Sequence, residues 1–166
     1  MKRSLRTALA VLAATVIPIG GAHAAQTVPE NLGVSLEIVE ACEVGTIEAI
    51  AFGTQGTLGA AVDAEGSVSV TCPEDTEYSI ALDVGQGDSA TVTVRKMTGP
   101  ASATINYTLY SDAGRNTVWG DEEGNNRVTE TGSGAAQVHP IYARVPSQDT
   151  PAVGLYTDIV TVIVHY

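Results

Sequence analysis

Apolar and polar residues alternate with period two along most of this chain, a pattern that predicts short β-strands rather than helices. Clusters of Gly, Asp, Asn, Ser and Pro separate the alternating runs, as is typical of turns. We expect strands within residues 32–38, 44–52, 68–72, 78–82, 91–97, 105–109, 138–145 and 158–166. The least regular stretch, 114–137, is expected to be a long surface excursion. About eight short strands with no linker or internal repeat indicate an all-β, antiparallel sandwich of immunoglobulin type.

The last run, residues 158–166, is β-branched at six of nine positions and reads as a strand. One face of this strand would carry Val160, Val162, Val164 and Tyr166, and the other Ile159, Thr161, Ile163 and His165. An exposed apolar edge strand is a template for pairing with another chain. We therefore expect this strand to be covered or paired.

A second apolar row lies near the other end of the chain, where four apolar residues alternate with Gly33, Ser35 and Glu37. The row consists of Leu32, Val34, Leu36 and Ile38. It fits either the first strand of a complete sandwich or a segment that docks into a partner, and the pattern alone does not decide between them.

The first 24 residues are typical of a secretion signal that is removed. Lys2, Arg3 and Arg6 precede an apolar stretch at 8–19, and Ala22-His23-Ala24 provides a small-residue cleavage site, although a cut one residue later also fits. The alternative is a retained membrane anchor, but the apolar stretch is too short to span a bilayer comfortably.

The charge balance argues against nucleic acid and anionic lipid as partners. The chain has eight Lys and Arg against 19 Asp and Glu, and the first 24 residues hold three of the basic residues and none of the acidic ones. The remainder therefore has five basic and 19 acidic residues, a net charge of −14. Both of those partners require a basic footprint.

Two cysteines, Cys42 and Cys72, are predicted to form one disulfide, because the chain is exported. The alternative is a pair of free thiols or metal ligands. The sequence has no Cys-x-x-Cys motif and only two histidines beyond the signal, which disfavours a metal site.

The sequence offers little support for an enzyme, and we expect no catalytic residue, metal or cofactor. His139 and His165 stand alone in predicted strands, where a histidine is usually a surface residue. The acidic loop 121–126 lacks the alternating ligand spacing of a calcium-binding loop.

Nine short pieces, in order along the chain, carry a family resemblance. They are Cys42-Glu43-Val44, Phe52-Gly53, 67–72, 78–82, Arg95-Lys96-Met97, 106–112, Trp119-Gly120, 142–146 and 154–158. These pieces resemble the spore coat protein U domain, which includes the subunits of archaic, Csu-type chaperone–usher pili. The resemblance covers essentially all of the chain after the signal.

The resemblance implies a pilus subunit with an incomplete sandwich that receives one strand in trans. A periplasmic chaperone would supply that strand temporarily, and at an outer-membrane usher the N-terminal segment of the next, identical or related, subunit would replace it. The donor segment would lie in 25–41 and carry Leu32, Val34, Leu36 and Ile38, ahead of a pilin-like domain at 42–166. The edge of the acceptor groove would be Val160, Val162, Val164 and Tyr166.

The same resemblance places the protein in the periplasm and then at the cell surface, with no membrane anchor of its own, in a fimbrium that supports adhesion or biofilm formation. The alternative is a self-complete secreted sandwich that binds a surface ligand or glycan through loops around Trp119. A lone Trp in a sandwich is more often a core residue than a ligand platform.

Overall fold

The computed structural model describes residues 30–39 and 41–166. Its contacts divide the chain into two units, Met1–Glu37 and Ile38–Tyr166. Residues 30–39 adopt neither helix nor strand. The predicted secretion signal, 1–24, lies outside the described residues. None of the helical structure that is described is long and apolar enough to cross a membrane.

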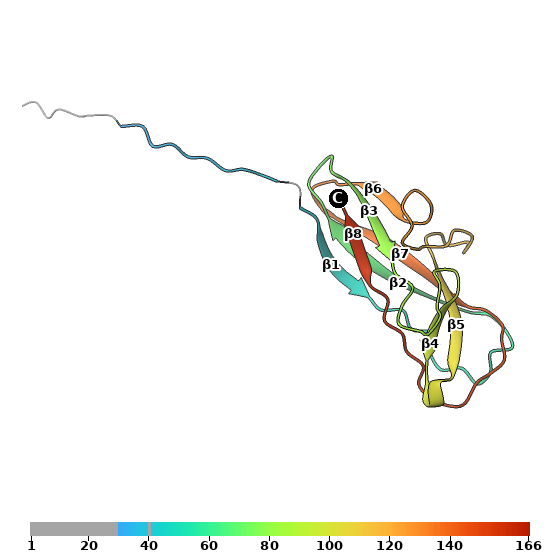
Figure 1. The fold of residues 1–166 in the computed structure, drawn as a ribbon. Helices are drawn as coiled ribbons and strands as arrows, with labels where there is room; N and C mark the ends of the chain where they lie inside the picture. The colour runs from blue at the N-terminus through green and yellow to red at the C-terminus, as the bar shows by residue number, and fades with distance from the viewer. Residues whose placement is uncertain (1–29, 40) are drawn as a thin grey trace, which may run out of the picture. The chain divides into compact units, whose positions relative to one another are not determined.

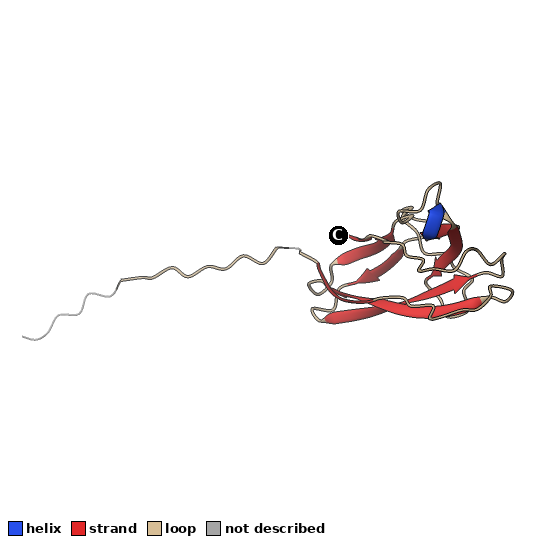
Figure 2. Ribbon diagram, turned by 90° about the horizontal axis from the view of Figure 1, so that it is seen from below, coloured by secondary structure: helices blue, strands red, loops and turns tan. Residues whose placement is uncertain are grey.

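The second unit is a sandwich of two antiparallel sheets (Figures 1 and 2). The larger sheet has the order β1 (Glu43–Glu48), β2 (Val62–Thr71), β7 (Ala136–Val145), β5 (Thr104–Tyr110) and β4 (Arg95–Thr98). The smaller sheet has the order β6 (Val128–Thr131), β3 (Glu77–Leu82) and β8 (Val162–His165). The helical part of the described chain is a short 3-10 turn, Pro100–Ser102. The predicted all-β, immunoglobulin-like class is confirmed.

The core forms where the inward faces of the two sheets meet. In most strands its buried side chains recur at every second position, as in Val68 and Val70 of β2, whereas in β3 the small Ala81 is buried as well as Ile80 and Leu82. This is the pattern expected of strands with one face on the core and one face in solvent. The period-two pattern in the sequence therefore identified the buried face of each of these strands correctly.

The predicted disulfide between Cys42 and Cys72 is present. It joins the residue before β1 to the residue after β2, next to the first pair of their ladder, Glu43 with Thr71. Every residue of β1 is exposed, so side-chain burial contributes little to holding this strand. The cross-link closes a loop between residues 30 apart and should add about 3–4 kcal/mol on the chain-entropy model.

The prediction that 114–137 is a surface excursion is wrong in three places. Val118 forms a bridge with Tyr110, β6 occupies Val128–Thr131, and β7 already begins at Ala136. The sequence pattern missed β6 because this edge strand turns only Val128 toward the core. Trp119, by contrast, behaves as expected of a core residue, since it is 1 % exposed and its indole N–H donates to the carbonyl of Ile80.

Three predicted strands are shorter in the structure, and the run expected as a strand at 32–38 is not a strand. The run at 44–52 is a strand only as far as Glu48. The run at 91–97 is a strand only from Arg95, because Thr91 and Val94 close a turn through reciprocal main-chain hydrogen bonds. The run at 158–166 is a strand only over Val162–His165.

A buried arginine explains where the last strand begins. Arg95 is fully buried, and its guanidinium lies against the end of β3. It donates to the carbonyls of Asp83 at 2.8 Å, Val92 at 2.8 Å, Leu82 at 2.9 Å and Trp119 at 3.0 Å. Burial lowers the pKa of Arg95, but it remains a cation because its ordinary pKa is so high.

The regular ladder between β3 and β8 ends at the residue whose main-chain carbonyl, that of Asp83, accepts a hydrogen bond from the Arg95 guanidinium. The last regular pair is Leu82 with Val162. At the next pair the N–H of Asp83 still donates to the carbonyl of Thr161, at 3.1 Å. The return bond, however, runs from the N–H of Thr161 to the carboxylate of Asp83, because the carbonyl of Asp83 accepts from Arg95. The strand is therefore shorter than its β-branched sequence predicts.

Arg95→Met should lower the free energy of unfolding by about 3 kcal/mol, because it leaves four carbonyls without a charged donor. The matched control is Lys96→Met, since Lys96 is the next residue of β4 and makes an exposed bond to the carbonyl of Asp88. Urea unfolding followed by Trp119 fluorescence measures the difference. Equal midpoints for the two variants would contradict the role given to Arg95.

Candidate strand-docking groove

An apolar groove of about 380 Å³ opens between the two sheets. Its walls come from the segment around the end of β1 and from the residues that lead into β8, and its floor comes from the core strands. The apolar and aromatic residues that line it are Ile47, Ala49, Ile50, Phe52, Leu82, Met97, Tyr107, Leu109, Ile141, Tyr156, Ile159, Val160 and Val162.

Both walls of the groove end in strand edges that lack a ladder partner among the described strands. β1 pairs with β2 and lies at one edge of the larger sheet, while β8 pairs with β3 and lies at one edge of the smaller sheet (Figure 1). Edge strands present unpaired N–H and C=O groups to any chain that can reach them. The arrangement of two free edges around an apolar floor is what a sandwich lacking one strand would leave.

Several groove residues are only partly buried even though they pack on the core. Among them are Ile50, Phe52, Met97, Val160 and Val162. An added strand with an apolar face would remove these side chains from water, at roughly 25 cal/mol per Å² of apolar surface.

The four predicted groove-edge residues lie in and beside β8 and differ in how far they are buried. Val160 and Val162 line the groove, and Val164 packs partly buried against the core. Tyr166 is 60 % exposed and does not line the groove. The outward face carries Ile163, which is exposed, as period two requires.

The predicted donor row has exposed side chains. Leu32, Val34 and Leu36 are each 89 % exposed, and Ile38 is 82 % exposed. Four large apolar side chains at alternate positions are costly to leave in water, so the row is suited to burial against another surface.

Sequence reasoning missed the groove wall formed by residues 49–52. This segment passes over β2 at Gly66, where a Cβ atom would lie 2.7 Å from Cγ1 of Ile50 and 2.5 Å from the carbonyl oxygen of Glu48. Glycine therefore permits the close crossing that brings Ile50 and Phe52 to the groove. The only sequence signal was the apolar spacing of those two residues after β1.

The groove has one polar corner. The hydroxyl of Tyr107 donates to Oδ2 of Asp158 at 2.7 Å, and both residues line the groove. Burial raises the pKa of Tyr107, and the adjacent carboxylate raises it further, so the phenol stays protonated. Sequence reasoning gave Asp158 no role, although it interrupts an otherwise apolar run.

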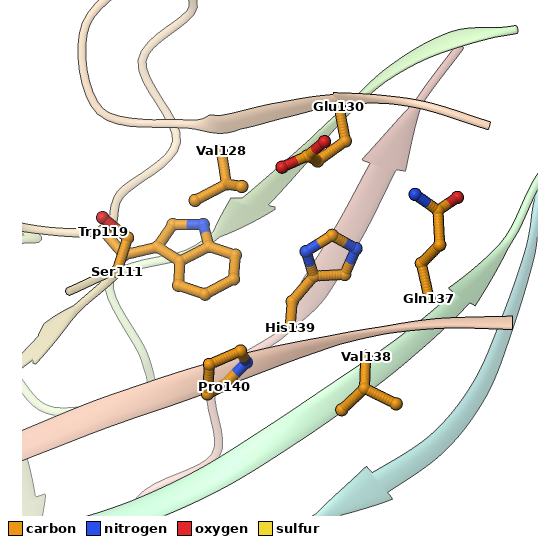
Figure 3. A pocket seen from close by; sticks show the side chains of 8 residues that line it. All are labelled: Ser111, Trp119, Val128, Glu130, Gln137, Val138, His139 and Pro140. Carbon is orange, nitrogen blue, oxygen red and sulfur yellow. The ribbon is translucent and has the colours of Figure 1, made fainter. Parts of the chain in front are cut away.

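A second cavity, of about 490 Å³, lies by β6 and β7 (Figure 3). Its lining includes Ser111, Trp119, Val128, Glu130, Gln137, Val138, His139 and Pro140. Because Trp119 is buried and its N–H is already bonded, it offers no ring face as a ligand platform.

The expectation that His139 is a surface residue is wrong. Its side chain is buried and shares a 2.9 Å hydrogen bond between Nε2 and the hydroxyl of Tyr78. This bond satisfies one ring nitrogen within the core, which a lone histidine in the sequence does not reveal. Burial lowers the pKa of His139, while the nearby carboxylate of Glu130 partly opposes that shift.

No group of three or more His, Cys, Asp or Glu side chains that could hold a metal occurs in the part of the chain described. In the acidic loop 121–126, the amide of Asn125 donates to the carboxylate of Glu122 at 2.7 Å. The side-chain oxygen of Asn126 in turn accepts from the N–H of Glu122 at 2.8 Å. These side chains therefore bond within the loop.

Comparisons with known proteins identify one family and several solved structures of similar fold. A family model described as Spore Coat Protein U domain matches residues 29–163. No curated protein matches the chain significantly.

Among solved structures, the chain is similar to one in the crystal structure of the CsuC–CsuE chaperone–tip adhesion subunit pre-assembly complex from archaic chaperone-usher Csu pili of Acinetobacter baumannii. The match has a TM-score of 0.56 at 21 % identity, and it covers 78 % of this chain and 40 % of that one. At this identity the likeness concerns the fold.

His139 should make the protein less stable as the pH falls from 7.5 to 5.5. Because the folded state lowers the pKa of His139, the unfolded chain binds more protons below about pH 6.5, and stability is lost there by up to about 1.4 kcal/mol per pH unit. Urea unfolding at several pH values should show this slope in the parent and in His165→Gln. His139→Gln should lack it, and an unchanged slope in that variant would refute the assignment.

Proposed function

The chain belongs to the Spore Coat Protein U domain family, and from this membership and the open groove we propose that it is a structural subunit of an archaic chaperone–usher pilus. The observation that carries the proposal is the apolar groove between the free edges of β1 and β8. In this proposal the protein has a structural rather than a catalytic role, since each subunit polymerises by accepting a strand from one neighbour and donating a strand to another.

The occupant of the groove in the fibre is the apolar row of another subunit. Residues 25–41 form the donor segment, with Leu32, Val34, Leu36 and Ile38 facing the groove, and 42–166 form the domain that receives it. Burying four such side chains is worth roughly 6–12 kcal/mol before the cost of ordering the segment. Main-chain bonds to the free edges would then fix the register.

The alternation of the donor row also sets its register. Gly33, Ser35 and Glu37 lie between the apolar residues, so they face away from the groove when the row is docked. A slip by one residue would turn the glutamate inward and all four apolar side chains outward. The alternation therefore favours a single docking register over non-specific hydrophobic binding.

Before assembly, a periplasmic chaperone occupies the same groove, and an outer-membrane usher exchanges that strand for the donor segment of the next subunit. The fold likeness to a chaperone–subunit structure of Csu pili supports this proposal, and the disulfide fits an oxidising compartment. Val160, Val162 and Val164 form the inward face of the acceptor edge, with Tyr166 available to the chaperone. The assembled fibre is at the cell surface, where it supports adhesion or biofilm formation.

A charge in the donor row should stop assembly. Leu36→Asp places an unpaired carboxylate in the apolar groove, which costs several kcal/mol, so fibres seen by electron microscopy should be lost. The matched control is Ser35→Asp, which adds the same charge one position away, on the face turned from the groove. Fibres from Leu36→Asp as abundant as those from the control would contradict the donor assignment.

A charge on the acceptor edge should abolish capture by the chaperone. Val162→Asp puts the charge into the groove, whereas Ile163→Asp puts it on the exposed outer face of the same strand. Co-expression with the chaperone and co-purification measures capture. We expect the complex with Ile163→Asp but not with Val162→Asp, and equal yields would rule out this edge as the site.

A further inference from the structure

The acceptor edge is held in place by side-chain carboxylates where the ladder between β3 and β8 stops. Oδ1 of Asp83 accepts from the N–H of Thr161 and from the N–H of Gly85, both at 2.9 Å. The carboxylate of Asp83 therefore accepts the Thr161 hydrogen bond in place of the Asp83 carbonyl, which accepts from Arg95. It fixes the end of the segment 158–161 next to β8.

Asp158 fixes the other end of this segment. Its Oδ1 accepts from the N–H of Gln86 at 2.7 Å and from its own neighbour, Ile159, at 2.8 Å. Its Oδ2 accepts from the hydroxyl of Tyr107 at 2.7 Å. One carboxylate thus joins the edge segment to the turn after β3 and to a core residue of β5.

The turn after β3 is shaped to receive this carboxylate. Gly85 has a φ of +79°, and a Cβ atom there would lie 2.8 Å from Cγ and 2.9 Å from Oδ1 of Asp158. Only glycine combines the left-handed conformation with the absence of a side chain at this contact. The turn and Asp158 therefore fit each other closely.

The buried guanidinium of Arg95 balances the charge of these carboxylates. Its charge acts on both Asp83 and Asp158. Burial disfavours ionisation of Asp83, but the hydrogen bonds from Thr161 and Gly85 and the charge of Arg95 outweigh burial and lower its pKa. The hydrogen-bonded anion is thus the stable form of Asp83 at neutral pH.

From these contacts we propose that Asp83 and Asp158 are positioning residues of the strand-docking groove. They hold 158–161 in a fixed, extended path, so that Val160 faces the groove and the free edge is preformed for an incoming strand. A preformed edge binds faster and more tightly because its ordering cost is met before docking. This inference rests on the proposed function, since it assigns residues that prepare the groove for its occupant.

The experiment measures the rate at which a labelled peptide of residues 30–39 binds to the full chain. The chain carries Leu36→Asp, so that its own donor row cannot occupy the groove of a neighbouring copy. Asp158→Ala should slow association about tenfold and speed hydrogen exchange at Gln86 and Ile159. Asp158→Asn keeps an oxygen for those two N–H groups and should recover most of the rate. Asp149→Ala, an exposed carboxylate in the connection before β8, should bind like the parent.

Tyr107→Phe gives an independent test if Asp158→Ala does not fold, because it removes one hydrogen bond and keeps the ring. It should slow association about threefold. A merely structural role would lower the urea midpoint and leave the association rate of the folded fraction unchanged, which would overturn the inference. A parent that did not bind the peptide would instead overturn the proposed function, and the inference with it.

Discussion

The main constraint on the described sandwich is the apolar groove between the free edges of β1 and β8. The main-chain groups of these edges and the apolar side chains of the groove would be paired and buried by one added strand. Unpaired main-chain groups and partly buried apolar residues such as Phe52 and Val160 are both costly in water. One added strand with an apolar face satisfies both at once. Because the need is for main-chain bonds and alternate apolar side chains, any segment with the right period can meet it. This suits the proposed exchange of a chaperone strand for a subunit strand.

Polar contacts and a disulfide hold the residues that form the walls of the groove. Arg95 holds the end of β3 through four carbonyls, and the carboxylates of Asp83 and Asp158 hold the segment that leads into β8. On the opposite wall, the disulfide secures β1, whose exposed side chains contribute little. Hydrogen bonds to charged side chains and a disulfide thus hold the groove walls in place, whereas hydrophobic packing holds the strands elsewhere in the core.

The sequence predicted those parts of the fold that depend on local pattern. Period two located most strands, and it placed Val162 and Ile163 on opposite faces of β8. The errors arose where residues distant in the sequence decide the structure. β8 is short because Arg95 bonds to the carbonyl of Asp83, just after β3, and His139 is buried where it bonds to Tyr78. The groove floor could not be predicted by pattern, since its residues come from four separate strands, β3, β4, β5 and β7. Asp158 was overlooked because a single carboxylate before a strand has no distinctive local signature.

The most direct test of the account is whether the donor row of one copy lies in the groove of another. Fibres can be assembled from two pools of subunits, one with labelled leucine methyl groups and one with labelled valine methyl groups, and studied by solid-state NMR. The account predicts contacts between Leu36 of one pool and groove valines such as Val162 of the other. The account would be contradicted if these contacts were absent between the pools but present in a doubly labelled copy diluted in unlabelled subunits, because the sandwich would then complete itself.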